Sequence, residues 1–165
     1  MENMLGLLKV RVVKATNLAI RDLKSSDPYV VLTLGNQMVK TRVVRKNLNP
    51  VWDEELTLAI PKSTPPLKLQ VLDKDTLSKD DKMGDAEIDL QPLVTSVNMR
   101  NNPQSVNSDT ELRRLVASKD NCLGKDSCIR HVSGQTIQDL CLRLQNVESG
   151  ELEVEIRWID LPQAT

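Results

Sequence analysis

Hydrophobic and polar residues alternate along most of the first 90 residues, which is the pattern of half-buried antiparallel strands. Within residues 8–12, a leucine and two valines share one face, while a lysine and an arginine share the other. Turn-forming pairs such as Gly35-Asn36, Asn49-Pro50 and Gly84-Asp85 separate the apolar segments. Counting the clear runs predicts about eight strands, which fit an all-β sandwich of two four-stranded sheets. The predicted strands after the first are 29–34, 39–44, 56–60, 67–72, 86–90, 140–144 and 151–158.

Residues 91–134 interrupt this alternation and predict an insertion. Pro92 is tolerated in the first turn of a helix, so a short helix is expected to begin there. Asp109 is placed to cap a second short helix. The apolar side of that second helix would carry three residues at helical spacing, namely Leu112, Leu115 and Val116.

A hairpin is expected at the end of the insertion, where Ser133-Gly134 separates two strand-like runs. The last apolar segment alternates strongly and is needed to complete the sheets. Trp52 and Trp158 are expected to pack in the core. The predicted architecture is therefore one domain over residues 1–165, with a partly helical insertion over about 91–134 before the last two strands.

Composition excludes several classes of function. The 165 residues carry 22 basic and 23 acidic side chains, a net charge of −1 that argues against a dedicated nucleic-acid binder. One histidine, His131, cannot build a multi-histidine zinc site, and no nucleophile–base pair is recognisable, so no enzyme is predicted. Three cysteines without a secretory signal predict reduced thiols inside the cell. No apolar run approaches the roughly 20 residues that span a bilayer, so any membrane contact is expected to be peripheral.

Two acidic loops carry the informative chemistry. Asp22 and Asp27 lie in the first loop, and five aspartates fall within residues 73–85 of the second. Two like charges 4 Å apart repel by about 4 kcal/mol at an effective dielectric near 20, so such crowding is costly. Hard divalent cations with six to eight oxygen ligands relieve it, and Ca²⁺ tolerates irregular geometry better than Mg²⁺.

The second loop has two other interpretations. An EF-hand fails because Leu77, Ser78 and Gly84 stand where an oxygen ligand, the turn glycine and a bidentate glutamate are needed. The alternative of a solvated charge run stays open for one Asp-x-Asp pair alone. Two acidic loops that each follow a strand favour a metal site.

The spacing of successive motifs resembles the C2 domain family. The motifs are Asp27-Pro28-Tyr29, Lys40-Thr41-Arg42, Asn49-Pro50-Val51-Trp52 and Val71-Leu72-Asp73-Lys74-Asp75, followed by Asp81-Lys82-Met83-Gly84. The resemblance implies an eight-stranded antiparallel C2 β-sandwich of the type II topology, with loops at one end that bind Ca²⁺ and anionic phospholipid. It also assigns the calcium ligands, which are the side chains of Asp22, Asp27, Asp73, Asp75 and Asp81 and the backbone carbonyls of Arg21 and Lys74.

The segment after Leu90 and the run 142–152 narrow the resemblance to the plant C2-domain abscisic-acid-related family. That resemblance implies an adaptor that recruits soluble abscisic acid receptors to the plasma membrane in a calcium-dependent way. A second implied function is the activation of an Obg-like GTPase/ATPase, for which Arg113 and Arg114 are the candidate arginine donors. The implied location is the cytoplasm, reversibly at the membrane, with the nucleus as a second site.

Lipid contacts are expected from basic and apolar residues. Lys40 and Arg42 are expected to share one strand face, which either contacts anionic lipid or is an ordinary solvated face. The adjacent strand offers Val31 and Thr33 instead of lysines, so phosphoinositide specificity is not expected. The apolar candidates for membrane contact on the acidic loops are Leu23, Leu77 and Met83.

Overall fold

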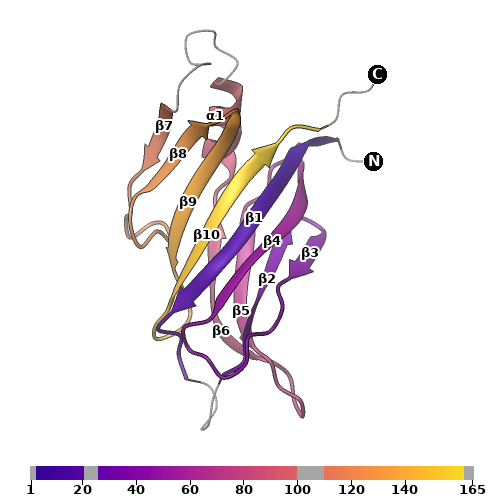
Figure 1. The fold of residues 1–165 in the computed structure, drawn as a ribbon, viewed down its shortest axis with the longest axis vertical. Helices are drawn as coiled ribbons and strands as arrows, with labels where there is room; N and C mark the ends of the chain where they lie inside the picture. Colours follow the sequence, from indigo (N-terminus) through magenta and orange to yellow (C-terminus); the bar gives the residue numbers. More distant parts are fainter. Residues whose placement is uncertain (1–2, 21–25, 100–109, 162–165) are drawn as a thin grey trace.

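The computed structural model describes residues 3–20, 26–99 and 110–161, which form two packed sheets and one helix (Figure 1). Among these residues, no helix is long and apolar enough to cross a bilayer. The elements are β1 (Met4–Thr16), β2 (Pro28–Leu34), β3 (Gln37–Lys40), β4 (Val51–Pro61), β5 (Leu67–Asp73), β6 (Asp81–Ile88), α1 (Gln91–Met99), β7 (Thr110–Leu115), β8 (Ser127–Val132), β9 (Gln135–Arg143) and β10 (Glu151–Ile159).

The predicted antiparallel sandwich is confirmed. One sheet has the order β4-β1-β10-β9-β8-β7 and the other the order β3-β2-β5-β6. The alternation in the sequence places one face of each strand in the core, as in β1, where Val10 and Val12 are fully buried. Trp52 and Trp158 are also buried, as predicted.

The structure of the insertion agrees with the prediction except at one of the two expected helices. The helix that begins near Pro92 is present as α1, and the hairpin at Ser133-Gly134 joins β8 to β9. The expected second helix after Asp109 is wrong, because residues 110–115 form strand β7 at the edge of the larger sheet. The apolar spacing that suggested a helix arises because β7 contains a bulge between Glu111 and Arg113. The described residues therefore form ten strands, two more than predicted.

Strand β3 is shorter than the predicted run 39–44. It ends at Lys40, and the chain beyond it continues along the edge of β2 without regular pairing. Thr41 N donates to Val30 O at 2.9 Å, and Val44 N donates to Pro28 O at 3.0 Å. These bonds hold the segment against the start of β2, where the first acidic loop ends.

Gly84 lies inside β6 rather than in a turn, which corrects the prediction at Gly84-Asp85. The register of β5 and β6 shifts between Gln70 and Leu72, so a bulge includes Gly84, whose φ is +113°. A Cβ there would lie 2.7 Å from Val147 Cγ1 and 2.8 Å from Leu144 Cβ. Both the backbone conformation and the space therefore require glycine at this position.

We expect Gly84→Ala to lower the free energy of unfolding by about 2 kcal/mol, because strain and overpacking add at one site. Gly134→Ala is the matched control, since Gly134 also has a positive φ (+81°) but a Cβ added there would meet nothing within 4 Å. Urea denaturation of both variants measures the difference. Equal losses would show that packing against Val147 and Leu144 contributes nothing.

The outer face of the larger sheet is covered by cross-strand ion pairs. Arg11 lies 2.6 Å from Asp53 Oδ1, and Lys9 and Arg157 both contact Glu55. The Arg11 guanidinium lowers the pKa of the Asp53 carboxyl by hydrogen bonding and charge. Exposed pairs of this kind contribute little stability, so this face acts mainly as a charge-balanced surface.

Candidate metal centre

Strand register brings the two acidic loops to one rim of the smaller sheet. Asp27 immediately precedes β2, Asp73 ends β5 and Asp81 begins β6. Pro28 is the partner of Asp73 across β2 and β5, and Asp73 is the partner of Asp81 across β5 and β6. Neighbouring strands lie about 4.8 Å apart, so these aspartates are neighbours although they are far apart in sequence. Asp73 stands between the other two.

Direct hydrogen bonds join the first loop to the second. Asp27 N donates to Asp73 Oδ1 at 2.8 Å, and Lys74 N donates to Asp27 O at 3.0 Å. Asp27 Oδ1 accepts from Lys46 N at 2.8 Å. Asp73 is 1% exposed, whereas Asp27 is half-buried. The buried carboxylate of Asp73 therefore anchors both loops.

Asp75 organises the second loop around itself. Its Oδ1 accepts from Leu77 N at 3.0 Å, and its Oδ2 accepts from Ser78 Oγ at 2.7 Å. These bonds favour the ionised form and lower the pKa of Asp75, with the bond from the Leu77 backbone contributing most. The loop is therefore folded back on a carboxylate that stays charged.

Asp80 is the residue that the sequence prediction missed. It accepts hydrogen bonds from the Tyr29 hydroxyl and, at 2.9 Å, from Asp75 N. Lys74 Nζ lies 3.9 Å from its Oδ2. The bond from Tyr29 is the main reason that the pKa of Asp80 is lowered. The sequence signals were the doubled Asp80-Asp81 and a tyrosine two residues after Asp27, but neither indicates this contact alone.

Tyr29 is buried, and burial together with the Asp80 carboxylate raises its pKa to about 12. Because Tyr29 is the only tyrosine in the chain, the ultraviolet absorbance of tyrosinate reports this group alone. Asp80→Asn is expected to move the titration of Tyr29 from about 12 towards the ordinary value near 10. Asp81→Asn, the same charge change one residue along, is expected to leave it in place.

The raised pKa of Tyr29 makes the stability of the protein depend on pH in the alkaline range. The unfolded chain loses the Tyr29 proton first, so the stability from this group is present below pH 10, falls as pH rises, and is lost above about pH 12. Asp80→Asn should reduce that alkaline loss. An unchanged titration in Asp80→Asn would contradict the role assigned to the hydrogen bond.

The donor chemistry fits a hard divalent cation, because carboxylate and carbonyl oxygens are the ligands that Ca²⁺ takes. Within the part of the chain that the structure describes, no three Asp, Glu, His or Cys side chains are grouped closely enough to hold an ion. Asp75 is engaged by its own loop, and the predicted ligands Arg21 and Asp22 lie outside the described residues. The rim therefore has the right donors, and their coordination of an ion is a proposal.

Of the three apolar residues predicted to contact lipid, the structure leaves one exposed, buries one and does not describe the third. Leu77 is 95% exposed at the tip of the second loop, and Leu23 lies outside the described residues. The prediction for Met83 is wrong, because Met83 points into the core from β6 and is fully buried. Ile20, which borders the first loop, is 67% exposed and was not predicted.

The basic pair Lys40 and Arg42 does not share a strand face, because β3 ends at Lys40. Lys40 is exposed opposite Val31. The Arg42 guanidinium donates to Trp52 O and forms an ion pair with Glu54 at 3.8 Å, and its backbone N donates to Glu54 Oε1. Part of the charge and hydrogen-bonding capacity of Arg42 is therefore used in contacts within the protein.

Comparison with known proteins agrees with the geometry. The C2 domain family matches residues 6–108. The calcium-bound pair of C2 domains from Extended-Synaptotagmin 2 superposes with a TM-score of 0.66 at 23% identity, covering 98% of this chain and 48% of that one. At that identity the likeness supports the fold alone.

Relatives that match over nearly their whole length identify a narrower family within the C2 domains. Protein C2-DOMAIN ABA-RELATED 3 of Arabidopsis thaliana is 49% identical over 162 residues, covering 98% of this chain and 95% of the relative. GTPase activating protein 1 of Oryza sativa subsp. indica is 47% identical, covering 97% and 95%. The probable ADP-ribosylation factor GTPase-activating protein AGD13 of A. thaliana is 52% identical, but the match spans 48% of its length. The chain therefore belongs to the C2-domain ABA-related family of C2 domains.

Proposed function

We propose that the protein is a Ca²⁺-dependent peripheral membrane adaptor with no catalytic activity of its own. The observation that carries this proposal is the meeting of two acidic loops at one rim, where Asp27, Asp73 and Asp81 are neighbours in the strand register. The exposed Leu77 belongs to the same rim. We also propose that residues 1–165 act as one C2 domain with an insertion over about 91–134.

The proposed calcium ligands are five side chains and two backbone carbonyls. Crowded carboxylates repel by about 4 kcal/mol for a pair 4 Å apart at an effective dielectric near 20, and they also repel anionic headgroups. When bound, calcium supplies positive charge to which headgroup oxygens can bind. The ligands are the side chains of Asp22, Asp27, Asp73, Asp75 and Asp81 and the carbonyls of Arg21 and Lys74.

Lipid contact is proposed for Leu77, Leu23 and Lys40. Leu77 would enter the headgroup region with its whole side chain, since it is almost fully exposed. A basic side chain near an anionic leaflet contributes about 1 kcal/mol, so Lys40 would add a modest attraction. Arg42 would add less, because Glu54 already neutralises part of its charge.

The partner proposed for the membrane-bound protein is a soluble abscisic acid receptor. Membership of the family supports this partner, through the name carried by its full-length relatives. The test is recruitment: a purified receptor should sediment with phosphatidylserine vesicles only when both this protein and Ca²⁺ are present. Receptor that never sediments would remove the adaptor role and leave membrane binding intact.

Sedimentation with phosphatidylserine vesicles tests the membrane proposal itself. Binding is expected with Ca²⁺, and it should be lost with a chelator or with vesicles of phosphatidylcholine alone. Leu77→Ser is expected to weaken vesicle binding about tenfold without changing Ca²⁺ binding in solution, because one buried leucine is lost. Val116→Ser, at a 65% exposed position away from the rim, is the matched control. Binding that persists in chelator would overturn the mechanism.

A second candidate function is favoured by the rice relative, whose name describes a GTPase activator and which this chain covers almost completely. In this alternative the protein would stimulate an Obg-like GTPase/ATPase through an arginine. Arg113 is exposed and has no ion pair among the described residues, whereas Arg114 is paired with Glu111 and Asp126. Stimulated nucleotide hydrolysis that is lost in Arg113→Ala and kept in Arg114→Ala would support it.

A further inference from the structure

Strand β6 is an edge strand of the smaller sheet, and part of its open side is already covered by the chain itself. The order β3-β2-β5-β6 gives β6 one strand neighbour, β5. On the other side, Asp85 N donates to Gln145 O at 3.1 Å, and Gln145 N donates to Asp85 O at 2.7 Å. This antiparallel bridge shows that the edge of β6 accepts backbone pairing from a further segment.

The backbone of Glu87 continues the same edge beyond this bridge. In an antiparallel ladder, residues that bond to the partner strand alternate with residues whose N–H and C=O point away from it. Asp85 bonds outward, so its pair with Gln70 is of the second kind. Glu87, which pairs with Lys68, is two residues further along and is of the same kind. Its N–H and C=O therefore point to the open side, where no segment of the described chain bonds to them.

Two cavities border β6 at this point, one on each face of the sheet. The first, of about 610 Å³, lies on the outer face, where Lys68 of β5 lines it. The second, of about 350 Å³, lies on the core side, where Ile88 lines it. Glu87 and Cys122 line both cavities. Because successive side chains of a strand point to opposite faces, a strand added beside Glu87 would direct its side chains alternately into the two cavities.

The outer cavity favours a basic side chain. Its charged lining residues are Asp85, Glu87 and Lys68, which leave a net charge of −1. Asp85 accepts from Asn146 Nδ2 at 3.1 Å, whereas Glu87 is exposed and forms no ion pair within the described ranges. The other polar lining residues are neutral, so they do not compensate the carboxylates. They are Thr33, Gln70, Gln145 and Asn146.

The core-side cavity favours an uncharged side chain. Two arginines, two carboxylates and two amides line it together with the apolar residues, so it carries no net charge. Arg114, one of the two arginines, is already held in two ion pairs. The apolar side chains that are still partly or largely exposed come from the insertion and are Leu115, Val116 and Cys122. An apolar residue of an added strand would cover them.

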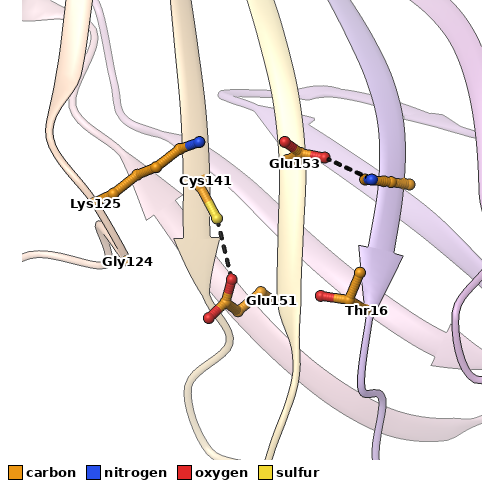
Figure 2. Close-up of a pocket in the computed structure, with 7 residues that line it drawn as sticks. Thr16, Gly124, Lys125, Cys141, Glu151 and Glu153 are labelled. Carbon is orange, nitrogen blue, oxygen red and sulfur yellow. Dashed lines mark hydrogen bonds and ion pairs between the residues drawn. The ribbon is translucent and has the colours of Figure 1, made fainter.

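A third cavity, on the outer face of the larger sheet, shows the contrast (Figure 2). It lies over β1, β10 and β9, and each of these strands has a neighbour on both sides, so no open strand edge borders it. Its charged groups also pair with one another. The Cys141 thiol donates to Glu151 at 3.2 Å, and Lys14 pairs with Glu153 at 3.6 Å.

We propose that the open edge of β6 at Glu87 binds an extended segment of a partner protein in which basic and apolar residues alternate. A basic residue pairs with Glu87 through two backbone hydrogen bonds and places its side chain beside the Glu87 and Asp85 carboxylates. Its apolar neighbours enter the core-side cavity. In such strand addition, backbone bonds supply affinity and alternate side chains supply specificity.

The proposed edge is separate from the candidate metal centre. Glu87 is near the end of β6 that leads into α1, whereas the acidic loop between β5 and β6 is at the opposite end of the strand (Figure 1). The segment therefore binds without Ca²⁺, and its binding can be tested independently of the proposed membrane function.

The probe is the peptide acetyl-Lys-Val-Lys-Val-Lys-amide, added to the ¹⁵N-labelled full chain in the presence of a chelator. Saturable amide shift changes are expected at Glu87, its neighbour Ala86 and Cys122, with slower hydrogen exchange of the Glu87 N–H. The same peptide with glutamate in place of lysine should bind about tenfold more weakly, because opposite charges become like charges. Shift changes confined to the acidic loops would overturn the proposal, since they would show attraction to the aspartates alone.

Backbone pairing is tested with the lysine peptide N-methylated at its lysine backbone nitrogens. This peptide keeps the charge and the side chains but cannot donate to Glu87 O, so its binding should be lost. Binding equal to that of the unmethylated peptide would reject strand addition.

Glu87→Lys tests the assigned side chain and leaves the backbone edge in place. The preference should reverse, so that the glutamate peptide binds more tightly than the lysine peptide. Asp139→Lys is the matched control, because it makes the same charge change at an exposed position on the outer face of the larger sheet. It should keep the preference for lysine. An unchanged preference in Glu87→Lys would reject the site.

Discussion

Asp73→Asn is expected to abolish the Ca²⁺-dependent sedimentation of the protein with phosphatidylserine vesicles. Asp73 is the central carboxylate of the rim, and its Oδ1 accepts the Asp27 backbone N–H that joins the two acidic loops. Asparagine keeps the size and one acceptor oxygen but removes the charge. Losing a buried charge that is paired with a cation costs about 3 kcal/mol or more, so the affinity for Ca²⁺ should fall roughly 100-fold.

The matched control for this variant is Asp53→Asn. Asp53 pairs with Arg11 on the outer face of the larger sheet, so the same charge is removed far from the acidic loops. Titration calorimetry with Ca²⁺ and sedimentation in a Ca²⁺ series measure the two variants side by side. Circular dichroism checks that both remain folded. Sedimentation of Asp73→Asn equal to that of Asp53→Asn would show that Asp73 is no calcium ligand.

The second large effect is expected from Trp52→Ala, which should lower the free energy of unfolding by about 3–5 kcal/mol. Trp52 is fully buried between the sheets, and its Nε1 donates to Pro28 O at 3.3 Å. The variant loses apolar contacts, leaves a cavity and leaves that carbonyl without this donor. Because Pro28 follows Asp27, the first acidic loop should also be weakened.

Val51→Ala is the control for this prediction, because Val51 is adjacent in β4 but 57% exposed. Its change in unfolding free energy should stay within about 0.5 kcal/mol. Urea denaturation measures both variants, and hydrogen exchange of the Lys46 and Lys74 amides reports the first loop. A loss below about 1 kcal/mol for Trp52→Ala would contradict the packing role.

Regular alternation explains why most strands could be predicted from the sequence. Strand β10 is an example, since Leu152, Val154 and Ile156 are buried where the period of two places them. The sequence misled where an edge strand is irregular. In β7 the bulge after Glu111 shifts the alternation, and the spacing from Leu112 to Val116 then mimics a helix. Pairing with β8 decides the structure, and pairing is not visible in one segment.

At the acidic rim too, the sequence indicated some features, but it did not indicate contacts between distant residues. The resemblance to C2 domains implied that Asp27, Asp73 and Asp81 lie at one rim, and the strand register makes them neighbours. It could not show that Asp80 binds Tyr29, since that contact joins residues 51 positions apart. It also placed Met83 on the loop, because the start of β6 lies within the acidic run and could not be located from composition.

The acidic rim and the strands of the insertion lie in different sheets, and this separation has an evolutionary consequence. Asp27, Asp73 and Asp81 lie at the ends of β2, β5 and β6 of the four-stranded sheet, whereas β7 and β8 of the insertion extend the six-stranded sheet. Substitutions at the two places share few neighbours, and distant substitutions usually have additive effects. Under the proposed function, substitutions in the insertion would therefore leave the proposed response to calcium unchanged. The arrangement of the two sheets would thereby allow the insertion to diverge independently of the proposed metal centre.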